Sequence, residues 1–146
     1  MSKILVMYRE THDKIYLDQA NHIARILLAN PNLPEDKIPY WDYNAPNIPN
    51  ALRDASAGAI MASAFIELSS YDDKEDAKKY MNAATTILEN LSSERYKAAA
   101  GSNGGFILKH SVGHMPQHSE VDVPLTYADY YFLEAMKRYK EIMHYQ

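Results

Sequence analysis

The chain contains no cysteine, only five glycines and no long hydrophobic run in its 146 residues. The absence of cysteine excludes disulfides, thiolate metal sites and a cysteine nucleophile. The longest apolar run near the start, Ile4 to Met7, is shorter than the core of a signal peptide, and no segment approaches the ~20 apolar residues that span a bilayer. We therefore expect no membrane contact and a cytoplasmic location, or a periplasmic one if a signal lies further upstream.

Basic charge is also scarce, since 15 Lys and Arg face 19 Asp and Glu for a net charge of -4. Proteins that follow phosphate backbones normally gather their basic residues on one face, and Lys78 with Lys79 makes no such stripe. Gly101, Gly104 and Gly105 do not lead from a strand into a helix, so they form no phosphate-binding loop. We expect neither a nucleic-acid partner nor a cofactor.

The spacing of apolar residues predicts an all-α protein that forms a single domain over residues 1–146. The helix that opens at Asp54 carries almost no charge between Ser56 and Ile66, which predicts burial on all sides. A shorter helical turn is expected around Glu94 to Ala100. The remaining expected helices cover Ile4 to Glu10, Asp13 to Asn30, Lys74 to Leu91, and Thr126 nearly to the end.

An internal repeat relates residues 13–30 to residues 73–90 at a shift of 60, including Asp13 with Asp73 and Leu28 with Leu88. Alternation of a buried helix with an amphipathic one predicts an α/α-hairpin array, here a partial toroid of about two and a half hairpins. The ends of such an array expose apolar surface. We expect it on the flanks of the Ser56 to Phe65 helix and on Ile4 to Met7, together with self-association or an upstream half-barrel partner.

Two polar loops that lead into helices are the candidate binding surface. In the first, Trp41 and Asp42 suit a sugar, because aromatic faces stack on sugar rings and carboxylates accept hydroxyl hydrogens. Trp41 can equally pack beneath the loop. Arg53 and Asp54 can meet a carboxylate or sulfate, or Asp54 caps the helix while Arg53 pairs with it or with Asp42. An acid and base pair of Asp42 and Asp54 is a further alternative.

The second loop contains Ser111 and His114, which are expected to face a second sugar or to hydrogen-bond within the loop. His110, His114 and His118 have the spacing of a zinc site on a helix, but Gly113 and Pro116 forbid a regular helix there, so no metal is expected.

Other polar groups of this loop fit structural roles better than catalytic ones. Ser111, His118 and Asp122 resemble a catalytic trio only in composition, because no nucleophile elbow accompanies them. Glu120 and Asp122 are expected to cap the last helix or to tie the loop to its start. The aromatic residues that follow, Tyr127, Tyr130 and Tyr131, are expected in the core, with one hydroxyl reaching the cavity, and a binding platform is the alternative.

Three segments carry a family resemblance: VMYRET at Val6 to Thr11, the run from Asn30 to Ala64 that includes PYWDYNAPNIPNALRDASA, and GFILKHSVGHMPQHSEVDVPLTYADYYFLEA at Gly105 to Ala135. The chain resembles the C-terminal part of the unsaturated glucuronyl hydrolases, glycoside hydrolase family 88. The resemblance implies part of an (α/α)6 barrel. It also implies removal of a 4,5-unsaturated uronic acid from lyase-generated glycosaminoglycan fragments, by water addition across the double bond with the help of an aspartic acid.

The resemblance places the catalytic aspartates of the family upstream of any position equivalent to Met1, so no catalytic residue is assigned here. Family members that favour sulfated sugars carry additional Ser and Lys in the second loop, where this chain has His114 and Pro116. The expected function is therefore that of a glycoside hydrolase part that is inactive alone. The alternative is a non-catalytic helical module that binds an oligosaccharide or a protein.

Overall fold

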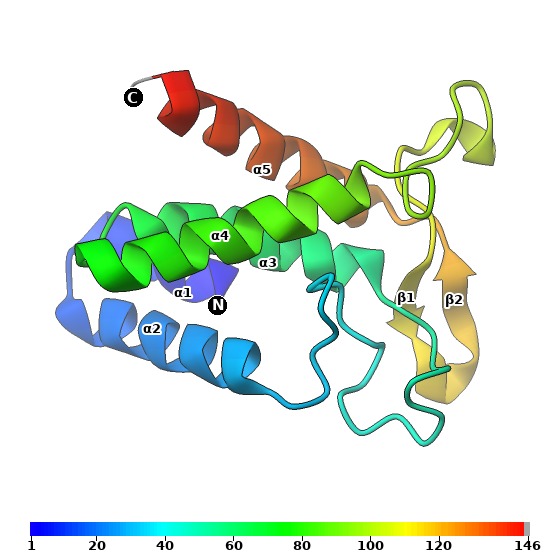
Figure 1. The fold of residues 1–146 in the computed structure, drawn as a ribbon, viewed down its shortest axis with the longest axis horizontal. Coiled ribbons are helices and arrows are strands. Elements are labelled where there is room, and N and C mark those ends of the chain that lie inside the picture. The colour runs from blue at the N-terminus through cyan, green and yellow to red at the C-terminus, as the bar shows by residue number, and fades with distance from the viewer. Residues whose placement is uncertain (145–146) are drawn as a thin grey trace.

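The computed structural model describes residues 1–144 as a helical array with one small β-hairpin (Figure 1). Five α-helices lie within this range: α1 Ser2–Thr11, α2 Lys14–Ala29, α3 Ala55–Ser69, α4 Lys74–Leu91 and α5 Thr126–His144. The strands β1 Ser111–His114 and β2 Ser119–Val123 pair in antiparallel fashion. No helix among the described residues is both long and apolar enough to cross a bilayer.

The helices form two layers, with α1, α3 and α5 in one and α2 and α4 in the other (Figure 1). In the first layer α3 lies between its neighbours, because Glu67 of α3 accepts from Arg9 of α1 at 3.1 Å and from Arg138 of α5 at 2.6 Å. In the second layer α2 and α4 are joined by the 2.8 Å ion pair of Arg25 with Asp76. The predicted array of two and a half hairpins is thus confirmed.

The helix starts follow the sequence closely because aspartates cap them. The side chains of Asp13, Asp54 and Asp73 accept from backbone N–H groups in the first turns of α2, α3 and α4. Asp13 and Asp73 are the pair that the internal repeat aligned, and they begin equivalent helices of the outer layer. The repeat therefore reflects the two hairpins α1–α2 and α3–α4.

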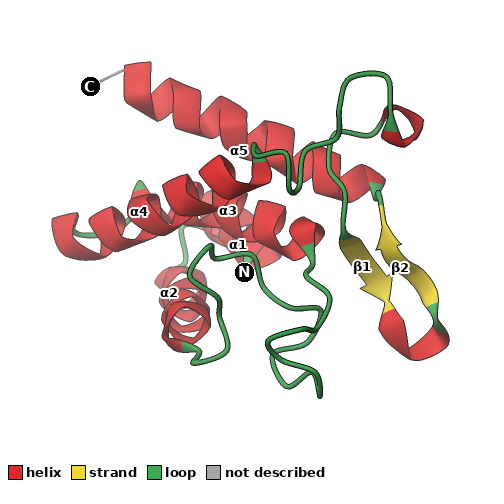
Figure 2. Cartoon of the chain, turned by 45° about the vertical axis from the view of Figure 1, so that its right-hand side comes forward, coloured by secondary structure: helices red, strands yellow, loops and turns green. Residues whose placement is uncertain are grey.

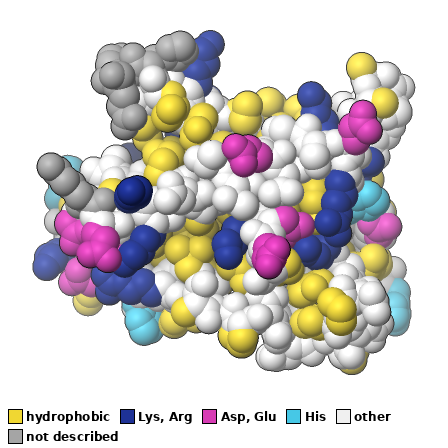
Figure 3. All heavy atoms as spheres, viewed as in Figure 1, with side chains coloured by type: hydrophobic (Ala, Val, Ile, Leu, Met, Phe, Trp, Pro, Cys, Tyr) yellow, Lys and Arg dark blue, Asp and Glu magenta, His cyan; other side chains and the backbone are white. Residues whose placement is uncertain are grey.

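The core is centred on α3, eleven of whose fifteen residues are buried. Phe65 of α3 stacks on Tyr80 of α4 with ring centroids 5.9 Å apart. The predicted burial of this helix on all sides is confirmed. The expectation that its flanks are exposed is wrong, because α1, α4 and α5 cover them. Exposed large apolar side chains occur on α1, on α2, in the first loop and, in the greatest number, on α5, beside which Figure 3 shows hydrophobic side chains gathered.

Three further expectations need correction. The second loop contains the β-hairpin, whose strands are too short for apolar and polar residues to show alternation. Residues 94–100 form turns and an isolated bridge between Lys97 and Leu108 in place of a helical turn. Tyr127 and Tyr130 are 40% and 59% exposed, whereas Tyr131 packs against the core.

Candidate functional site

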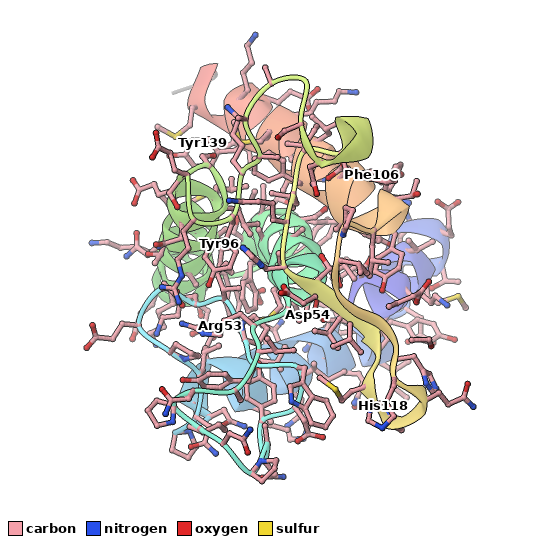
Figure 4. The ribbon with its side chains drawn as sticks, turned by 90° about the vertical axis from the view of Figure 1, so that its right-hand side faces the viewer. Arg53, Asp54, Tyr96, Phe106, His118 and Tyr139 are labelled. Atoms are coloured by element: carbon pink, nitrogen blue, oxygen red, sulfur yellow. The ribbon has the colours of Figure 1, made fainter. Side chains whose placement is uncertain are left out.

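The two polar loops meet at one end of the molecule, where α3 and α5 begin (Figure 2). Residues 30–54 form one side of this rim, and the β-hairpin with the segment before it forms the other. Figure 4 looks onto the rim and shows Arg53 and Asp54 near its centre, with His118 toward one edge. The N-terminal ends of both helices carry partial positive charge, which favours anionic groups at this end.

A hollow of about 390 Å³ opens beside the rim, between α2 and α3. Trp41, Asp42 and Asp54 line it together with apolar side chains, so the structure brings these three predicted residues together. Trp41 is half-buried, and its backbone N–H donates to the carbonyl of Leu52 across the loop at 3.0 Å. The hollow has the size and apolar lining of a small-molecule site. The remaining lining residues are Met1, Ile23, Leu27, Pro39, Tyr40, Tyr43, Ala57, Ile60 and Met61.

Asp54 joins the first loop, α3 and the β-hairpin. Its Oδ1 accepts from the backbone N–H and the hydroxyl of Ser56 at 3.0 and 2.6 Å, and from the N–H of Val112 at 3.2 Å. The predicted capping role of Asp54 is confirmed. Asp42 is exposed and accepts from the N–H of Asn44 at 2.7 Å. The two aspartates therefore share the hollow, but Asp54 has three structural donors.

Arg53 faces away from both aspartates that the sequence offered as its partners. It forms a bidentate ion pair with Asp36 at 2.9 Å, donates to the carbonyl of Ile38, and lies over the ring of Tyr40 at 4.8 Å. The expectation that Arg53 pairs with Asp54 or Asp42 is wrong, because its side chain points back beneath the loop. Asp36 lies 17 positions earlier in an irregular segment, where no periodic signal could identify it.

Ser111 and His114 lie at opposite ends of β1 and differ in exposure. Ser111 is fully buried, and its hydroxyl has no hydrogen-bond partner among the described residues. His114 is exposed and pairs in register with Ser119. The carbonyl of His110, the residue before β1, accepts the N–H of Ala55 at 3.0 Å. Together with the bond from Val112 to Asp54, this contact anchors β1 to the start of α3.

The histidines do not form the arrangements that their spacing suggested. The Nδ1 of His110 bonds to Asp122 at 2.7 Å across the hairpin, which ties the loop as predicted for Asp122. His118 lies at the turn of the hairpin with φ of 54°, away from that bond. The trio with Ser111 is therefore not assembled. Among residues 1–144 no group of three His, Asp or Glu is placed to hold a metal ion.

Tyr127, Glu120 and Asp129 are rim residues whose contacts the sequence did not reveal. Burial raises the pKa of Tyr127, a hydrogen bond with Ser56 acts in the opposite direction, and the nearby carboxylates of Asp54 and Glu120 raise it further. Asp129 of α5 accepts from the N–H groups of Ile107 and Leu108 at 2.8 and 2.9 Å, which fixes the segment before the hairpin. An acidic residue in the first turn of α5 was the only sequence signal for the role of Asp129. Its donors lie about twenty positions earlier, so the sequence did not identify them.

The curated proteins that this chain resembles are named as hydrolases of unsaturated glucuronyl or unsaturated chondroitin disaccharide substrates. A curated protein from Formosa agariphila, named unsaturated glucuronyl hydrolase, is 46% identical over 136 residues, which cover 93% of this chain and 33% of the relative. A second from Bacillus sp. GL1 with the same name is 35% identical over 84% of this chain and 32% of its own length. This chain matches the C-terminal part of the unsaturated glucuronyl hydrolases. No model of a known protein family matches it.

Solved unsaturated glucuronyl hydrolases give the same result at the level of the fold. A crystal structure of one specific for heparin superposes with a TM-score of 0.93 and 48% identity, over 97% of this chain and 38% of that protein. Another, from Streptococcus agalactiae in complex with dGlcA-GalNAc6S, has a TM-score of 0.78 and 30% identity, over 94% of this chain and 37% of that protein. The chain thus spans about a third of the length of these hydrolases and reproduces part of their (α/α)6 barrel.

Proposed function

We propose that this chain supplies the closing hairpins and part of the substrate rim of a hydrolase that removes 4,5-unsaturated uronic acid from lyase-generated oligosaccharides. The observation that carries the proposal is the superposition with TM-score 0.93 on a heparin-specific unsaturated glucuronyl hydrolase. The chain is proposed to have no turnover alone, because the resemblance places the catalytic aspartates in another part of the barrel.

The rim supports a binding role because it combines an apolar hollow with polar groups at its edge. The indole of Trp41 is available for stacking on a sugar ring, and the exposed carboxylate of Asp42 is available to accept sugar hydroxyls. Asp54 and Arg53 are proposed to support the rim without contacting the sugar, because Asp54 bonds to Ser56 and Val112 and Arg53 pairs with Asp36. Ser111 and His114 are proposed to contribute to the site of the second sugar, with Ser111 reached only after a shift of the hairpin.

A chimera tests the proposal directly. The matching third of the Formosa agariphila hydrolase is replaced by this chain, and release of unsaturated uronic acid is followed as loss of double-bond absorbance. We expect turnover in the chimera and none from this chain alone. Trp41→Ala should raise the KM of the chimera by roughly tenfold, because the substrate loses one stacking contact. Tyr16→Ala, on α2 outside the hollow, is the matched control.

Two outcomes contradict the proposal. A folded chimera without turnover would show that these loops do not fit the catalytic part of the family. Turnover by the isolated chain would assign the chemistry to its own residues, with Asp42 and Asp54 first to be replaced. Disaccharide binding to the isolated chain, with a folded but inactive chimera, would support the alternative of a non-catalytic binding module.

A further inference from the structure

Within residues 1–144, the two lateral edges of the inner layer are helix faces that no other helix covers. At one edge, α1 exposes a single face at helical spacing, with Val6 and Met7 39% and 44% exposed between the exposed Lys3 and Glu10. At the other edge, α5 exposes Tyr130 and Leu133, which are 59% and 54% exposed, followed by the exposed Lys137 and Lys140. Both edges thus carry an apolar centre.

Glu67 fixes how these edges align along the helix axes. It bonds Arg9 on one side and Arg138 on the other, so residue 9 of α1 and residue 138 of α5 lie at about the same height. The three inner helices run in the same direction (Figure 1). A twofold rotation about an axis parallel to them leaves every height unchanged.

That operation places α5 of one copy beside α1 of another with matching chemistry. With residue 9 level with residue 138, Glu10 comes level with a point between Lys137 and Lys140, while Val6 and Met7 lie within one helical turn of Leu133. Glu10 is 69% exposed and lies 3.4 Å from Arg9, and Lys137 is 76% exposed with a 3.8 Å contact to Glu141. Both charges are therefore available for a new partner. Each edge is complementary to the other and not to itself.

The number of inner helices agrees with this pairing. The chain has three inner helices and matches part of a barrel whose ring contains six. Two copies related by a twofold axis complete six inner helices and bury both edges in two identical seams. We propose that two copies of this chain, prepared on its own, associate through the α1 and α5 edges into a closed ring. The inference concerns the lateral edges and does not depend on the proposed function of the rim.

Sedimentation equilibrium over a range of concentrations tests the association. The expected species has twice the 16.7 kDa mass of the chain. Leu133→Glu should weaken association by about tenfold or more, because it replaces an apolar contact of the seam with a charged side chain that loses water on association. Ile26→Glu is the matched control, since Ile26 on the outer helix α2 is also 54% exposed and lies outside both edges. Circular dichroism and thermal unfolding verify that both variants remain folded.

A charge-swap pair tests the register. The first variant carries Glu10→Lys, and the second carries both Lys137→Glu and Lys140→Glu. The homodimer of either variant has two seams in which like charges face each other. Mixed together they form a heterodimer in which both seams are attractive, so we expect the mixture to associate more tightly than either variant. A wild-type monomer at all concentrations, a dimer indifferent to Leu133→Glu, mixing without rescue, or open polymers larger than two copies would each overturn the proposal.

Discussion

Arg53 and Asp36 form a bidentate ion pair that closes the first rim loop onto the body of the molecule. The Nη2 of Arg53 lies 2.9 Å from Oδ2 of Asp36, its Nη1 lies 3.0 Å from Oδ1, and both side chains are only 14% exposed. Tyr96 and Arg95 approach the same carboxylate at 3.4 and 3.6 Å. The loop that presents Trp41 to the hollow is thus held through a pair that itself lies away from the hollow.

Replacement of Arg53 by Lys tests the importance of this geometry. Lysine retains the charge but lacks the planar fork that bonds both carboxylate oxygens and the Ile38 carbonyl. We expect a loss of about 1–2 kcal/mol in the free energy of unfolding by urea denaturation. Arg25→Lys, in the ion pair between α2 and α4 whose arginine is 65% exposed, is the control and should change stability much less. Equal losses at both sites would contradict the role of the fork.

Asp54 provides a second prediction, because one oxygen serves both α3 and β1. Asp54→Ala should cost about 1–2 kcal/mol through loss of the cap, and it should also accelerate hydrogen exchange at the N–H of Val112. Asp54→Asn retains an acceptor oxygen and should be milder. Asp13→Ala removes a cap from α2 alone, so it should leave exchange at Val112 unchanged. Unchanged exchange in Asp54→Ala would refute the link between helix and hairpin.

The sequence was most informative where structure depends on local chemistry. The caps at Asp13, Asp54 and Asp73 and the apolar face of α3 set the helix boundaries within a residue, because capping and periodicity act over a single turn. The aromatic spacing of α5 misled, since Tyr130 has the period of a helix but lies on a face that the described residues leave 59% exposed. Periodicity identifies a face and not what covers it.

The site was predictable only in part for the same reason. Trp41, Asp42 and Asp54 meet at one hollow because they lie close together on one loop that leads into a helix. The partner of Arg53 and the donors to Asp129 lie 17 to 22 positions away along irregular backbone, where pairing is decided by tertiary packing. Ser111 was chosen as a polar loop residue, yet packing buries its hydroxyl completely.

Asp72 provides a prediction about pH. Desolvation by burial is the main cause that raises the pKa of this carboxyl, while its hydrogen bond from Asn21 at 2.8 Å acts in the opposite direction. Because the pKa is higher in the folded state than the unfolded value near 3.8, the charged form disfavours folding above the folded pKa. Protonation during acidification through that range therefore adds stability.

Asp72→Asn removes this dependence while retaining an oxygen for Asn21. We expect the variant to be more stable than the wild type at pH 7, with the difference shrinking as the pH falls through the raised pKa. Thermal unfolding across pH 3 to 8, reported as the difference between the two proteins, measures the effect. Asp18→Asn on the exposed face of α2 should show no comparable trend. A wild type that gains on the variant as the pH rises would reverse the sign and refute the assignment.

Gly113 and Glu120 make the last prediction, which concerns the shape of the hairpin. A Cβ at residue 113 would overlap the carboxylate of Glu120 and lie 2.9 Å from its Cβ, so Gly113→Ala must displace the opposite strand. We expect a cost of about 1–3 kcal/mol in unfolding free energy, typical of a steric insertion. Glu120 has φ of 53°, a conformation that glycine adopts without strain.

Glu120→Gly therefore removes the obstructing side chain without a backbone penalty at that residue. In a double-mutant cycle, Gly113→Ala should cost less in the Glu120→Gly background than in the wild type, by about 1 kcal/mol or more. Val121→Ala, at a neighbouring residue of β2 that pairs with Val112, is the control background and should leave the cost of Gly113→Ala unchanged. Additive costs in the Glu120→Gly cycle would mean that the strands separate by another route, and that Glu120 does not dictate glycine at position 113.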